Sequence, residues 1–229
     1  MFDKQVSIIT GGSSGIGEAV VELFLKEKTR VIVADKKLSD RGLFIRCDVS
    51  RYSHVKRVVK TAIKKFGRID FLINNAGIRL IKPLSEIREK EWDKVIDVNL
   101  KGSFLFSKEV LPYMIKQRYG VIVNTSSING KYGVPNLSAY CASKFGLVGL
   151  TESLAKEVEN YGIKVFAICP YPVDTETYRK LYPQHRTKNL INPLKVAKEV
   201  LKLCNPSCKV ESGSSIVIRK GILDYFTTS

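Results

Sequence analysis

Short apolar runs alternate with longer amphipathic segments along most of the chain. The apolar runs have the length of strands and are rich in β-branched residues, at positions 5–10, 30–35, 43–48, 69–77, 120–127, 163–170 and 214–221. Between them, apolar residues recur three and four positions apart, which is typical of amphipathic helices. Strands that alternate with helices predict a three-layer, doubly wound α/β fold, with a parallel sheet of about seven strands and helices on both faces.

No second domain is evident in the sequence. Its 229 residues contain no linker, internal repeat or low-complexity tract, and 44% of them are hydrophobic, as is usual in globular proteins. We therefore predict a single domain over residues 1–229. The stretch from residue 171 to about residue 192 has little apolar pattern, so we expect it to be irregular.

The charge of the chain narrows its candidate partners. The formal net charge of +16 favours contact with anions such as nucleic acid, an anionic surface or phosphorylated small molecules. Lysine and arginine are spread through the amphipathic segments, however, and no helix-turn-helix, zinc or RNA-binding motif accompanies them. We interpret them as solvated helix faces and expect no nucleic-acid partner. Because the longest apolar runs are only as long as strands, we expect no membrane association.

Cysteine and histidine usage argues against disulfides and metal. Five cysteines, an odd number, occur without a secretory signal, so we expect reduced thiols in a cytoplasmic compartment. Cys204 and Cys208 come nearest to a ligand pair, but no further cysteine or histidine neighbours them in sequence. We predict no metal site.

The first candidate for chemistry is the glycine-rich sequence TGGSSGIG at residues 10–17. It joins the first predicted strand to a helix and places Gly11, Gly15 and Gly17 in the turn. Glycines there allow a tight turn and a close approach of the backbone to a pyrophosphate, which the free N–H groups at the helix start can bind. The pattern predicts a dinucleotide site, although glycine-rich turns also occur for steric reasons alone.

An acidic residue ends the second predicted strand. Asp35 lies 18 residues beyond Gly17, where a carboxylate accepts hydrogen bonds from both hydroxyls of an adenosine ribose and repels a 2′-phosphate. This position favours NAD over NADP. Lys36 and Lys37 follow directly and weaken the discrimination, and an ordinary turn aspartate is the structural alternative.

A tyrosine and a lysine four residues apart form the second candidate for chemistry. Tyr140 and Lys144 occur among small residues in the sequence SAYCASKFG, on a predicted helix, so both side chains lie on one helix face. A free tyrosine has a pKa of about 10, and a neighbouring ammonium group lowers it. The pair is therefore a candidate general acid/base, and an ordinary exposed pair is the alternative.

Seven short motifs occur in a characteristic order. They are TGGSSGIG, CDV at 47–49, NNAG at 74–77, DVNLKG around Asn99, IVNTSS ending at Ser127, YCASK at 140–144 and CPYPVDT ending at Thr175. Each is weak alone, but together they span most of the chain and resemble the short-chain dehydrogenase/reductase family in its single-domain form. The resemblance implies a Rossmann-like fold, a nicotinamide cofactor and a reaction at an alcohol or carbonyl group.

By resemblance, Asn99, Ser127, Tyr140 and Lys144 form a catalytic tetrad. Ser127 is taken rather than Ser126 because it lies 13 positions before Tyr140, as in the family. The family roles are proton exchange with the substrate oxygen for Tyr140, a hydrogen bond to that oxygen for Ser127, and contact with the nicotinamide ribose for Lys144. Asn99 would hold a water that relays protons through Lys144; a helix-kink or capping asparagine is the structural alternative.

The same resemblance implies the remaining site residues. The cofactor contacts are Thr10, Gly11, Ser13, Ser14, Gly15, Ile16, Gly17, Asp35, Asp48, Val49, Asn75, Ala76, Gly77, Tyr140, Lys144, Pro170, Val173 and Thr175, and the substrate contacts are Ser127, Tyr140 and Tyr171. Residues 176–192 resemble the mobile lid over the substrate. The chain departs from the family at Tyr171, where a glycine usually follows Pro170; its ring either narrows the pocket or lines the entrance.

These observations favour an NAD-dependent oxidoreductase that interconverts a secondary alcohol, with sugars and polyols as candidates, and its carbonyl compound. An NADPH-dependent carbonyl or 3-oxoacyl reductase is the alternative, because of the basic composition and of Lys36 and Lys37. A non-catalytic nucleotide sensor or nucleic-acid binder is a third hypothesis, against which the presence of Tyr140 and Lys144 argues. By resemblance we also expect a homodimer or homotetramer, assembled through the long helices at about 101–117 and 138–160.

Overall fold

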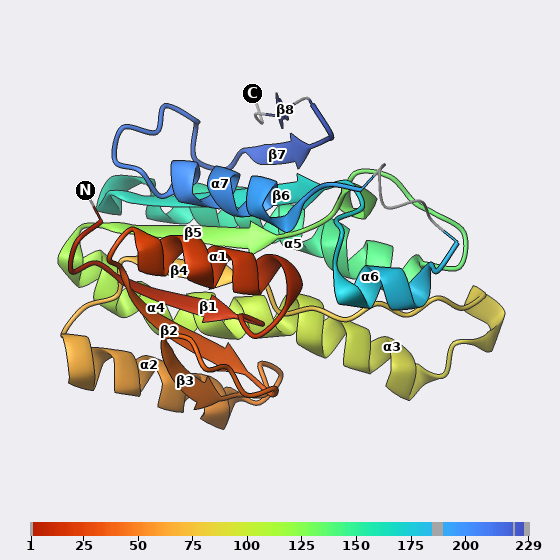
Figure 1. Ribbon diagram of the computed structural model, residues 1–229, viewed down its shortest axis with the longest axis horizontal. Helices are drawn as coiled ribbons and strands as arrows, with labels where there is room; N and C mark the ends of the chain where they lie inside the picture. Colours follow the sequence, from red (N-terminus) through yellow and green to blue (C-terminus); the bar gives the residue numbers. More distant parts are fainter. Residues whose placement is uncertain (1, 185–189, 222, 227–229) are drawn as a thin grey trace.

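The computed structural model describes residues 2–184, 190–221 and 223–226, the last four by their backbone alone. Figure 1 shows the parallel strands side by side, with their arrows pointing the same way and helices on both sides of the sheet. The strands are β1 Val6–Thr10, β2 Arg30–Asp35, β3 Leu43–Arg46, β4 Phe71–Asn74, β5 Gly120–Thr125, β6 Ile163–Pro170, β7 Ser215–Ile218 and β8 Leu223–Phe226. The α-helices are α1 Gly15–Lys26, α2 Tyr52–Phe66, α3 Glu89–Ile96, α4 Gly102–Gln117, α5 Ser138–Val158, α6 Glu176–Leu181 and α7 Pro193–Leu203.

The sheet has the strand order β3-β2-β1-β4-β5-β6-β7-β8 within the described residues. β1 to β7 pair in parallel, and β8 pairs with β7 in antiparallel. The direction of winding reverses between β1 and β4, and in such sheets ligands bind outside the carboxyl ends of the strands at this point. The predicted α/β fold with seven parallel strands is confirmed; the antiparallel eighth strand is an addition that the sequence did not predict.

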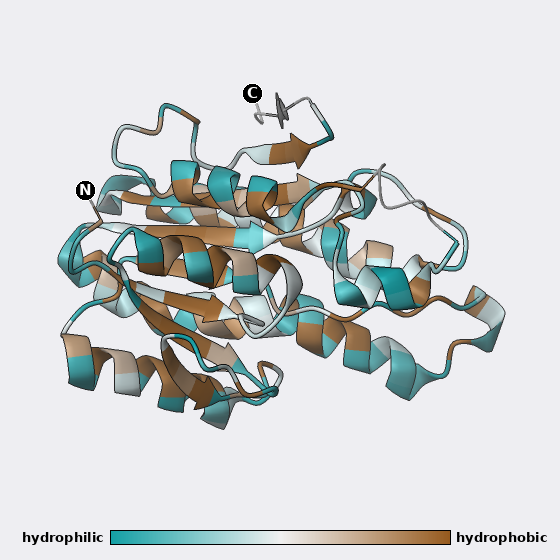
Figure 2. Ribbon diagram, in the orientation of Figure 1, coloured by the Kyte–Doolittle hydropathy of each residue, from teal (hydrophilic) through white to brown (hydrophobic). Residues whose placement is uncertain are grey.

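Each central strand contributes alternate side chains to two hydrophobic layers. In β1, Ile8 packs in the layer formed with α2, α4 and α5, whereas Ile9 packs in the layer formed with α1 and α7. Since both faces of these strands are covered, their sequences are nearly continuous apolar runs. Figure 2 shows the hydrophobic strands between helices that carry hydrophilic residues on their outer faces.

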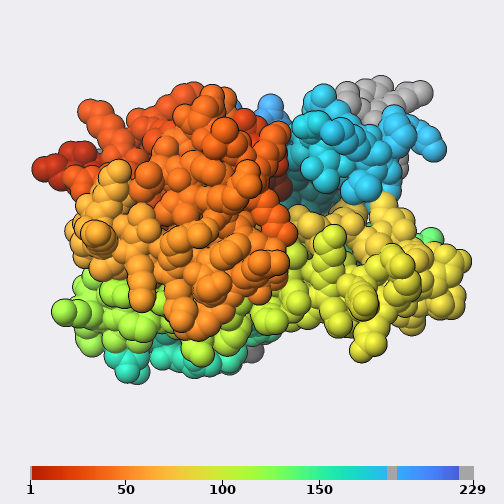
Figure 3. Space-filling view, turned by 90° about the horizontal axis from the view of Figure 1, so that it is seen from below, coloured from red at the N-terminus to blue at the C-terminus, as the bar shows by residue number. Residues whose placement is uncertain are grey.

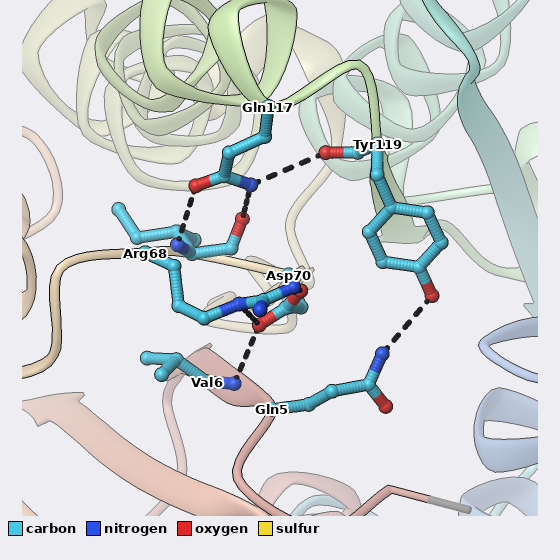
Figure 4. Close-up of polar contacts among 7 residues, drawn as sticks. Gln5, Val6, Arg68, Asp70, Gln117 and Tyr119 are labelled. Atoms are coloured by element: carbon cyan, nitrogen blue, oxygen red, sulfur yellow. Dashed lines mark hydrogen bonds and ion pairs between the residues drawn. The ribbon is translucent and has the colours of Figure 1, made fainter.

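A polar network holds the amino-terminal edge of the sheet. The carboxylate of Asp70, which is fully buried, accepts the backbone N–H of Val6 at 2.8 Å and is paired with the guanidinium of Arg68. The side-chain amide of Gln117 bonds the N–H and the carbonyl of Ile69 at 3.0 and 2.8 Å. Figure 4 shows how these contacts join the segment before β4 to the start of β1 and the end of α4. The network satisfies backbone groups that the strand ends would otherwise leave unpaired.

The stretch after residue 171, expected to be irregular, contains the short helix α6. The Thr175 hydroxyl caps it by accepting the N–H of Tyr178 at 3.1 Å, and an ion pair joins Glu176 and Lys180 at 2.6 Å. All its residues are at least partly exposed, so no buried apolar stripe marks it in the sequence. The expectation was wrong there because local capping and charge pairing form the helix. Residues 185–189 of the predicted lid lie outside the described residues.

Candidate active site

A cavity of about 690 Å³ opens at the carboxyl-terminal edge of the sheet. Its wall includes residues at or just beyond the ends of β1, β2, β4, β5 and β6, together with residues of α3, α5 and α6. Figure 3 shows, on one face of the molecule, the adjoining segments that carry β2 and β3 (orange), α3 (yellow) and α6 (blue). The volume is in the range of sites for cofactors and small molecules.

The loop between β1 and α1 is shaped to receive an anion. Gly11 adopts φ +65°, in the left-handed region that favours glycine. A Cβ on Gly17 would clash with the carbonyl oxygen of Gly11, so the loop folds this tightly only with glycine there. α1 begins at Gly15, and its N-cap residue, Ser14, makes no side-chain capping bond within the described residues. The first N–H groups of α1 therefore remain available for a phosphate at the cavity wall.

Asp35 ends β2 and lines the cavity beside this loop. Its carboxylate accepts the backbone N–H groups of Ser13 and Lys37, both at 3.0 Å. The neighbouring Lys36 pairs with Asp48 at 2.9 Å. Burial raises the pKa of Asp48, but hydrogen bonds from a nearby serine and from Lys36 outweigh it and hold that pKa at about 2. Lys36 thus compensates the charge of Asp48 rather than that of Asp35.

Three of the four predicted catalytic residues meet at one wall of the cavity. Tyr140 and Lys144 lie one turn apart on α5, with the Lys144 Nζ 5.6 Å from the centre of the Tyr140 ring. Ser127 follows β5, and its hydroxyl is near enough to the phenol of Tyr140 to lower the pKa of that phenol. Lys144 is buried and donates to the carbonyl of Thr125 at 2.6 Å. The phenol, the hydroxyl and the ammonium group thus adjoin one space.

The phenol of Tyr140 is more acidic than that of an ordinary tyrosine. Burial raises its pKa, but the positive charges of Lys144 and Arg79 and the hydrogen bonds from Ser127 and Arg79 outweigh burial, so the pKa lies below its usual value. Burial also lowers the pKa of Lys144, and the neighbouring phenol opposes this. A tyrosine with a lowered pKa in a cavity is suited to exchange a proton with a ligand.

Asn99 supports the site from behind the cavity wall. It is fully buried in a π-helix, Asp97–Lys101, that joins α3 to α4; such irregular turns are frequent at functional sites. Its Oδ1 accepts the N–H of Ile78 at 2.8 Å, and its Nδ2 donates to the carbonyl of Ile78 and to the hydroxyl of Ser143, both at 2.9 Å. Each polar atom of the side chain therefore has a protein partner, and the residue ties the NNAG turn to α5. This π-helix is an irregularity of the kind considered as the structural alternative to a catalytic role of Asn99.

Tyr171 forms part of the cavity wall at the end of β6. The ring is partly buried against Cys169 and Val217, and the guanidinium of Arg219 lies 5.2 Å from its centre. A side chain of this size takes up space that a glycine would leave open. Tyr171 thus lines the cavity, and a narrowing of the pocket by its ring stays a prediction.

Most of the predicted cofactor residues line the cavity. They are Gly11, Ser14, Gly15, Ile16, Asp35, Asp48, Val49, Asn75, Ala76, Gly77, Tyr140, Lys144, Pro170, Val173 and Thr175, and the three predicted substrate residues, Ser127, Tyr140 and Tyr171, line it too. The other three, Thr10, Ser13 and Gly17, are not part of the cavity wall. The Thr10 hydroxyl accepts the N–H groups of Asn75 and Ala76 at 2.9 and 3.0 Å, so this residue shapes the wall by joining the loops after β1 and β4.

Three further residues of the cavity wall, Arg79, Tyr178 and Tyr182, were not predicted from the sequence. Arg79 lies just after the NNAG turn, and its guanidinium carbon is 4.5 Å from the centre of the Tyr140 ring. Tyr178 lies on α6 and Tyr182 directly follows it, with ring centres 4.8 Å apart. The sequence signal that could have identified Arg79 is its place shortly after the NNAG motif at the end of β4, because a cationic residue there lies at the edge of the sheet where ligands bind. The two tyrosines, four positions apart, carried no comparable signal because α6 lacks an apolar stripe.

The sequence as a whole matches one enzyme family. A sequence model of that family, described as short chain dehydrogenase, matches residues 5–186. This chain is a short-chain dehydrogenase. It is 37% identical to the 3-oxoacyl-(acyl-carrier-protein) reductase FabG of Thermotoga maritima, over 97% of this chain and 99% of the relative. The family predicted from the seven motifs is thereby confirmed.

Two solved structures share the architecture of this short-chain dehydrogenase. A levodione reductase has a TM-score of 0.90 and 31% identity, over 96% of this chain and 98% of its own. The ligand-free aldohexose dehydrogenase of Thermoplasma acidophilum has a TM-score of 0.89 and 31% identity, over 95% and 93%. The family match and these relatives show that this chain is an NAD(P)-dependent oxidoreductase that acts on CH–OH groups.

The described residues fit a nicotinamide dinucleotide. The open N–H groups of α1 suit a pyrophosphate, the carboxylate of Asp35 suits ribose hydroxyls, and Lys144 lies beside the phenol of Tyr140. The five cysteines are free thiols. None of the described helices has the length and apolar character needed to cross a membrane.

Proposed function

We propose that this short-chain dehydrogenase is an NAD-dependent enzyme that interconverts a secondary alcohol and its carbonyl compound, with Tyr140 as the general acid/base. The observation that carries the proposal is the phenol of Tyr140. It lines the cavity and has a lowered pKa, caused by Lys144 and Arg79 and by the hydroxyl of Ser127 against the opposing effect of burial. The aldohexose dehydrogenase among the similar structures supports sugars and polyols as candidate alcohols.

Tyr140, Ser127 and Lys144 have different roles in the reaction at one substrate oxygen. Bound nicotinamide supplies or accepts the hydride. During reduction Tyr140 gives its proton to the carbonyl oxygen, and during oxidation its phenolate takes the hydroxyl proton back. Ser127 donates a hydrogen bond to the same oxygen and stabilises the charge that develops there. Lys144 favours the phenolate by its positive charge.

Asn99 has a positioning role in the site. Its side chain fixes Ile78 against Ser143, which keeps the NNAG turn in place beside Tyr140. Because each polar atom of this side chain already has a partner, a relay water at Asn99 would bind its backbone. That water stays a prediction drawn from the family.

NAD is the proposed cofactor because of the charges at the end of β2. The carboxylate of Asp35 is held at the cavity wall by two backbone N–H groups. Lys36 is paired with Asp48, so it does not offset the repulsion that Asp35 exerts on a 2′-phosphate.

An NADPH-dependent carbonyl or 3-oxoacyl reductase is the second candidate. The observation that favours it is the 37% identity to the FabG reductase of Thermotoga maritima over nearly the whole of both chains. Lys37 is exposed next to Asp35, where it can approach a phosphate. Dissociation constants for NADH and NADPH separate the two candidates, since a clear preference for NADPH would replace the first with the second.

The reaction itself is tested by nicotinamide absorbance during turnover. Both cofactors are combined with a panel of sugars, polyols, secondary alcohols, hydroxy acids and the corresponding carbonyl compounds. We expect activity on one class and its loss in Tyr140→Phe. Tyr161→Phe, which alters an exposed tyrosine outside the cavity, is the matched control. If the protein binds NADH but turns over no compound of the panel, the result would favour the non-catalytic nucleotide sensor.

We further propose a single domain over residues 1–229 that assembles in the cytoplasm as a homodimer or homotetramer. Phe104 on α4 and Phe145 on α5 support assembly, because 44% and 45% of their surfaces are exposed on the two long helices. The buried free thiols support a reducing compartment. Light scattering tests the assembly, and a monomer at micromolar concentration would contradict it.

A further inference from the structure

Arg79 places a second cation, besides Lys144, next to Tyr140 in the cavity. Its side chain is partly buried at the cavity wall. The guanidinium carbon lies 4.5 Å from the centre of the Tyr140 ring, and Nη1 donates to the hydroxyl of Tyr182 at 3.4 Å. The residue that handles the substrate oxygen is thus in direct contact with an arginine.

Within residues 2–184 and 190–221, no carboxylate pairs with Arg79. The ion-paired arginines of these ranges are Arg41, Arg51, Arg68, Arg88 and Arg179. Outside these ranges the sequence has one acidic side chain, that of Asp224. A guanidinium has five N–H donors, and within the described residues the hydrogen-bond acceptor of Arg79 is the phenol oxygen of Tyr182. A partly buried charge without a counter-charge is costly, and a bound anion relieves that cost.

Aromatic rings hold this guanidinium in place. Its carbon lies 4.5 Å from the ring centre of Tyr140, 6.0 Å from that of Tyr178 and 5.7 Å from that of Tyr182. Cation–π contacts of this kind attract and restrain an arginine. The planar fork is therefore ordered before a ligand arrives, which suits the two-pronged recognition of a carboxylate.

We propose that Arg79 binds a carboxylate of the substrate, and that the substrate is a hydroxy acid whose carboxylate lies a few bonds from the reacting carbon, together with the matching oxo acid. This inference rests on the proposed function, because Tyr140 defines where the reacting oxygen lies. Since Arg79 contacts that same phenol, an anion on its remaining N–H groups sits next to the reacting centre. A polyhydroxy acid meets this description as well as a short aliphatic one.

The other charges of the cavity agree with an anionic substrate. Lys144 and Lys94 also line it, and the chain as a whole carries a formal charge of +16. The two carboxylates in the wall, Asp35 and Asp48, lie at and beyond the end of β2 and β3, beside the glycine loop and Lys36. The positive potential around Tyr140 therefore raises the local concentration of acids over neutral ketones.

Binding of matched acid and ester pairs tests the inference. The pairs are pyruvate, 3-oxobutanoate and 4-oxopentanoate, each with its methyl ester, which keeps the ketone and removes the charge. Calorimetry on protein saturated with NAD⁺ gives dissociation constants without turnover. We expect the wild type to bind at least one acid more tightly than its ester. In Arg79→Gln the dissociation constant of that acid should rise about 10- to 150-fold, which is the loss typical of hydrogen bonds to a charged group. The dissociation constant of the ester should stay nearly unchanged.

Two further variants keep the result interpretable. Arg79→Lys retains the charge without the fork and is expected to recover part of the preference for the acid. Arg30→Gln is the matched control, because the guanidinium of Arg30 also lies over a ring, that of Phe66 at 5.5 Å, but at the start of β2, away from the cavity. It should leave the preference unchanged. A wild type that binds no acid more tightly than its ester, or an unchanged preference in Arg79→Gln, overturns the inference.

Turnover of the same pairs with NADH distinguishes this failure from failure of the proposed function. If the esters and other neutral ketones are reduced but no acid is preferred, the proposed function stands and the carboxylate site is wrong. If acids bind through Arg79 and neither acid nor ester is reduced with either nicotinamide, the carboxylate site stands and the proposed function is wrong.

Discussion

Substitution of Asp35 by serine removes the carboxylate that ends β2 and faces the cavity. In the wild type this group is held by the N–H groups of Ser13 and Lys37 at 3.0 Å, while Lys36 is paired with Asp48 at 2.9 Å. Because Lys36 is paired with Asp48, it does not offset the charge that Asp35 exerts on the cofactor. Asp35→Ser keeps a small polar side chain and removes that charge.

The size of the effect follows from simple electrostatics. A phosphate monoester carries close to two negative charges at neutral pH, and each costs about 1 kcal/mol at about 4 Å from a carboxylate in water. The wild type is thus expected to bind NADPH about 30-fold more weakly than NADH. Hydrogen bonds from ribose hydroxyls to the carboxylate add about 1.5–3 kcal/mol in favour of NADH. Asp35→Ser removes both effects, so the ratio of the two dissociation constants should change by at least about 30-fold.

Titration of NADH and NADPH by fluorescence or calorimetry measures this ratio. All titrations share one ionic strength, because salt screens the repulsion. Asp40→Ser is the control, since it removes the same charge from a nearby exposed position outside the cavity wall and should leave the ratio unchanged. A wild type that binds NADPH as tightly as NADH, or a ratio unaltered by Asp35→Ser, would refute the reasoning.

Three other substitutions have defined outcomes. Asp70→Ala leaves the backbone N–H of Val6 without its acceptor. It should lower the free energy of unfolding in urea by about 2–4 kcal/mol without lowering kcat/KM. A loss of stability below about 1 kcal/mol contradicts this prediction. Arg79→Gln removes a cation that lowers the pKa of Tyr140. Oxidation needs the phenolate, which prevails above that pKa, so the rising limb of the pH profile for a neutral alcohol should move to higher pH, and a limb that stays in place counts against the mechanism. Phe104→Glu together with Phe145→Glu should yield a smaller species in light scattering, and unchanged mass would exclude these helices as the interface.

The parts of the site that could be predicted from the sequence are encoded locally. Tyr140 and Lys144 are one helical turn apart, so their spacing alone brings them together. Ser127 follows a buried strand, and the carboxyl ends of parallel strands meet at one edge of the sheet. The glycine loop likewise lies within one strand-turn-helix unit.

The parts that could not be predicted depend on contacts between distant segments. Arg79 and Tyr182 are 103 positions apart, and they meet because α6 and the residue that follows it lie beside Arg79. α6 is held by a cap and ion pairs rather than by an apolar stripe. The short strand β8 exists through its pairing with β7. Periodicity carries no record of such contacts, and they include the residues to which we assign substrate choice.

The most direct test of the central claim is the rate of change of nicotinamide absorbance for the wild type, Tyr140→Phe and Tyr161→Phe on one active alcohol and ketone pair. The account predicts that Tyr140→Phe lowers kcat/KM by at least about 100-fold while still binding NADH, because general acid/base catalysis is worth about 10²–10⁴ in rate. Tyr161→Phe should match the wild type. A Tyr140→Phe variant that turns over at the wild-type rate would contradict the role of Tyr140 and the mechanism built on it.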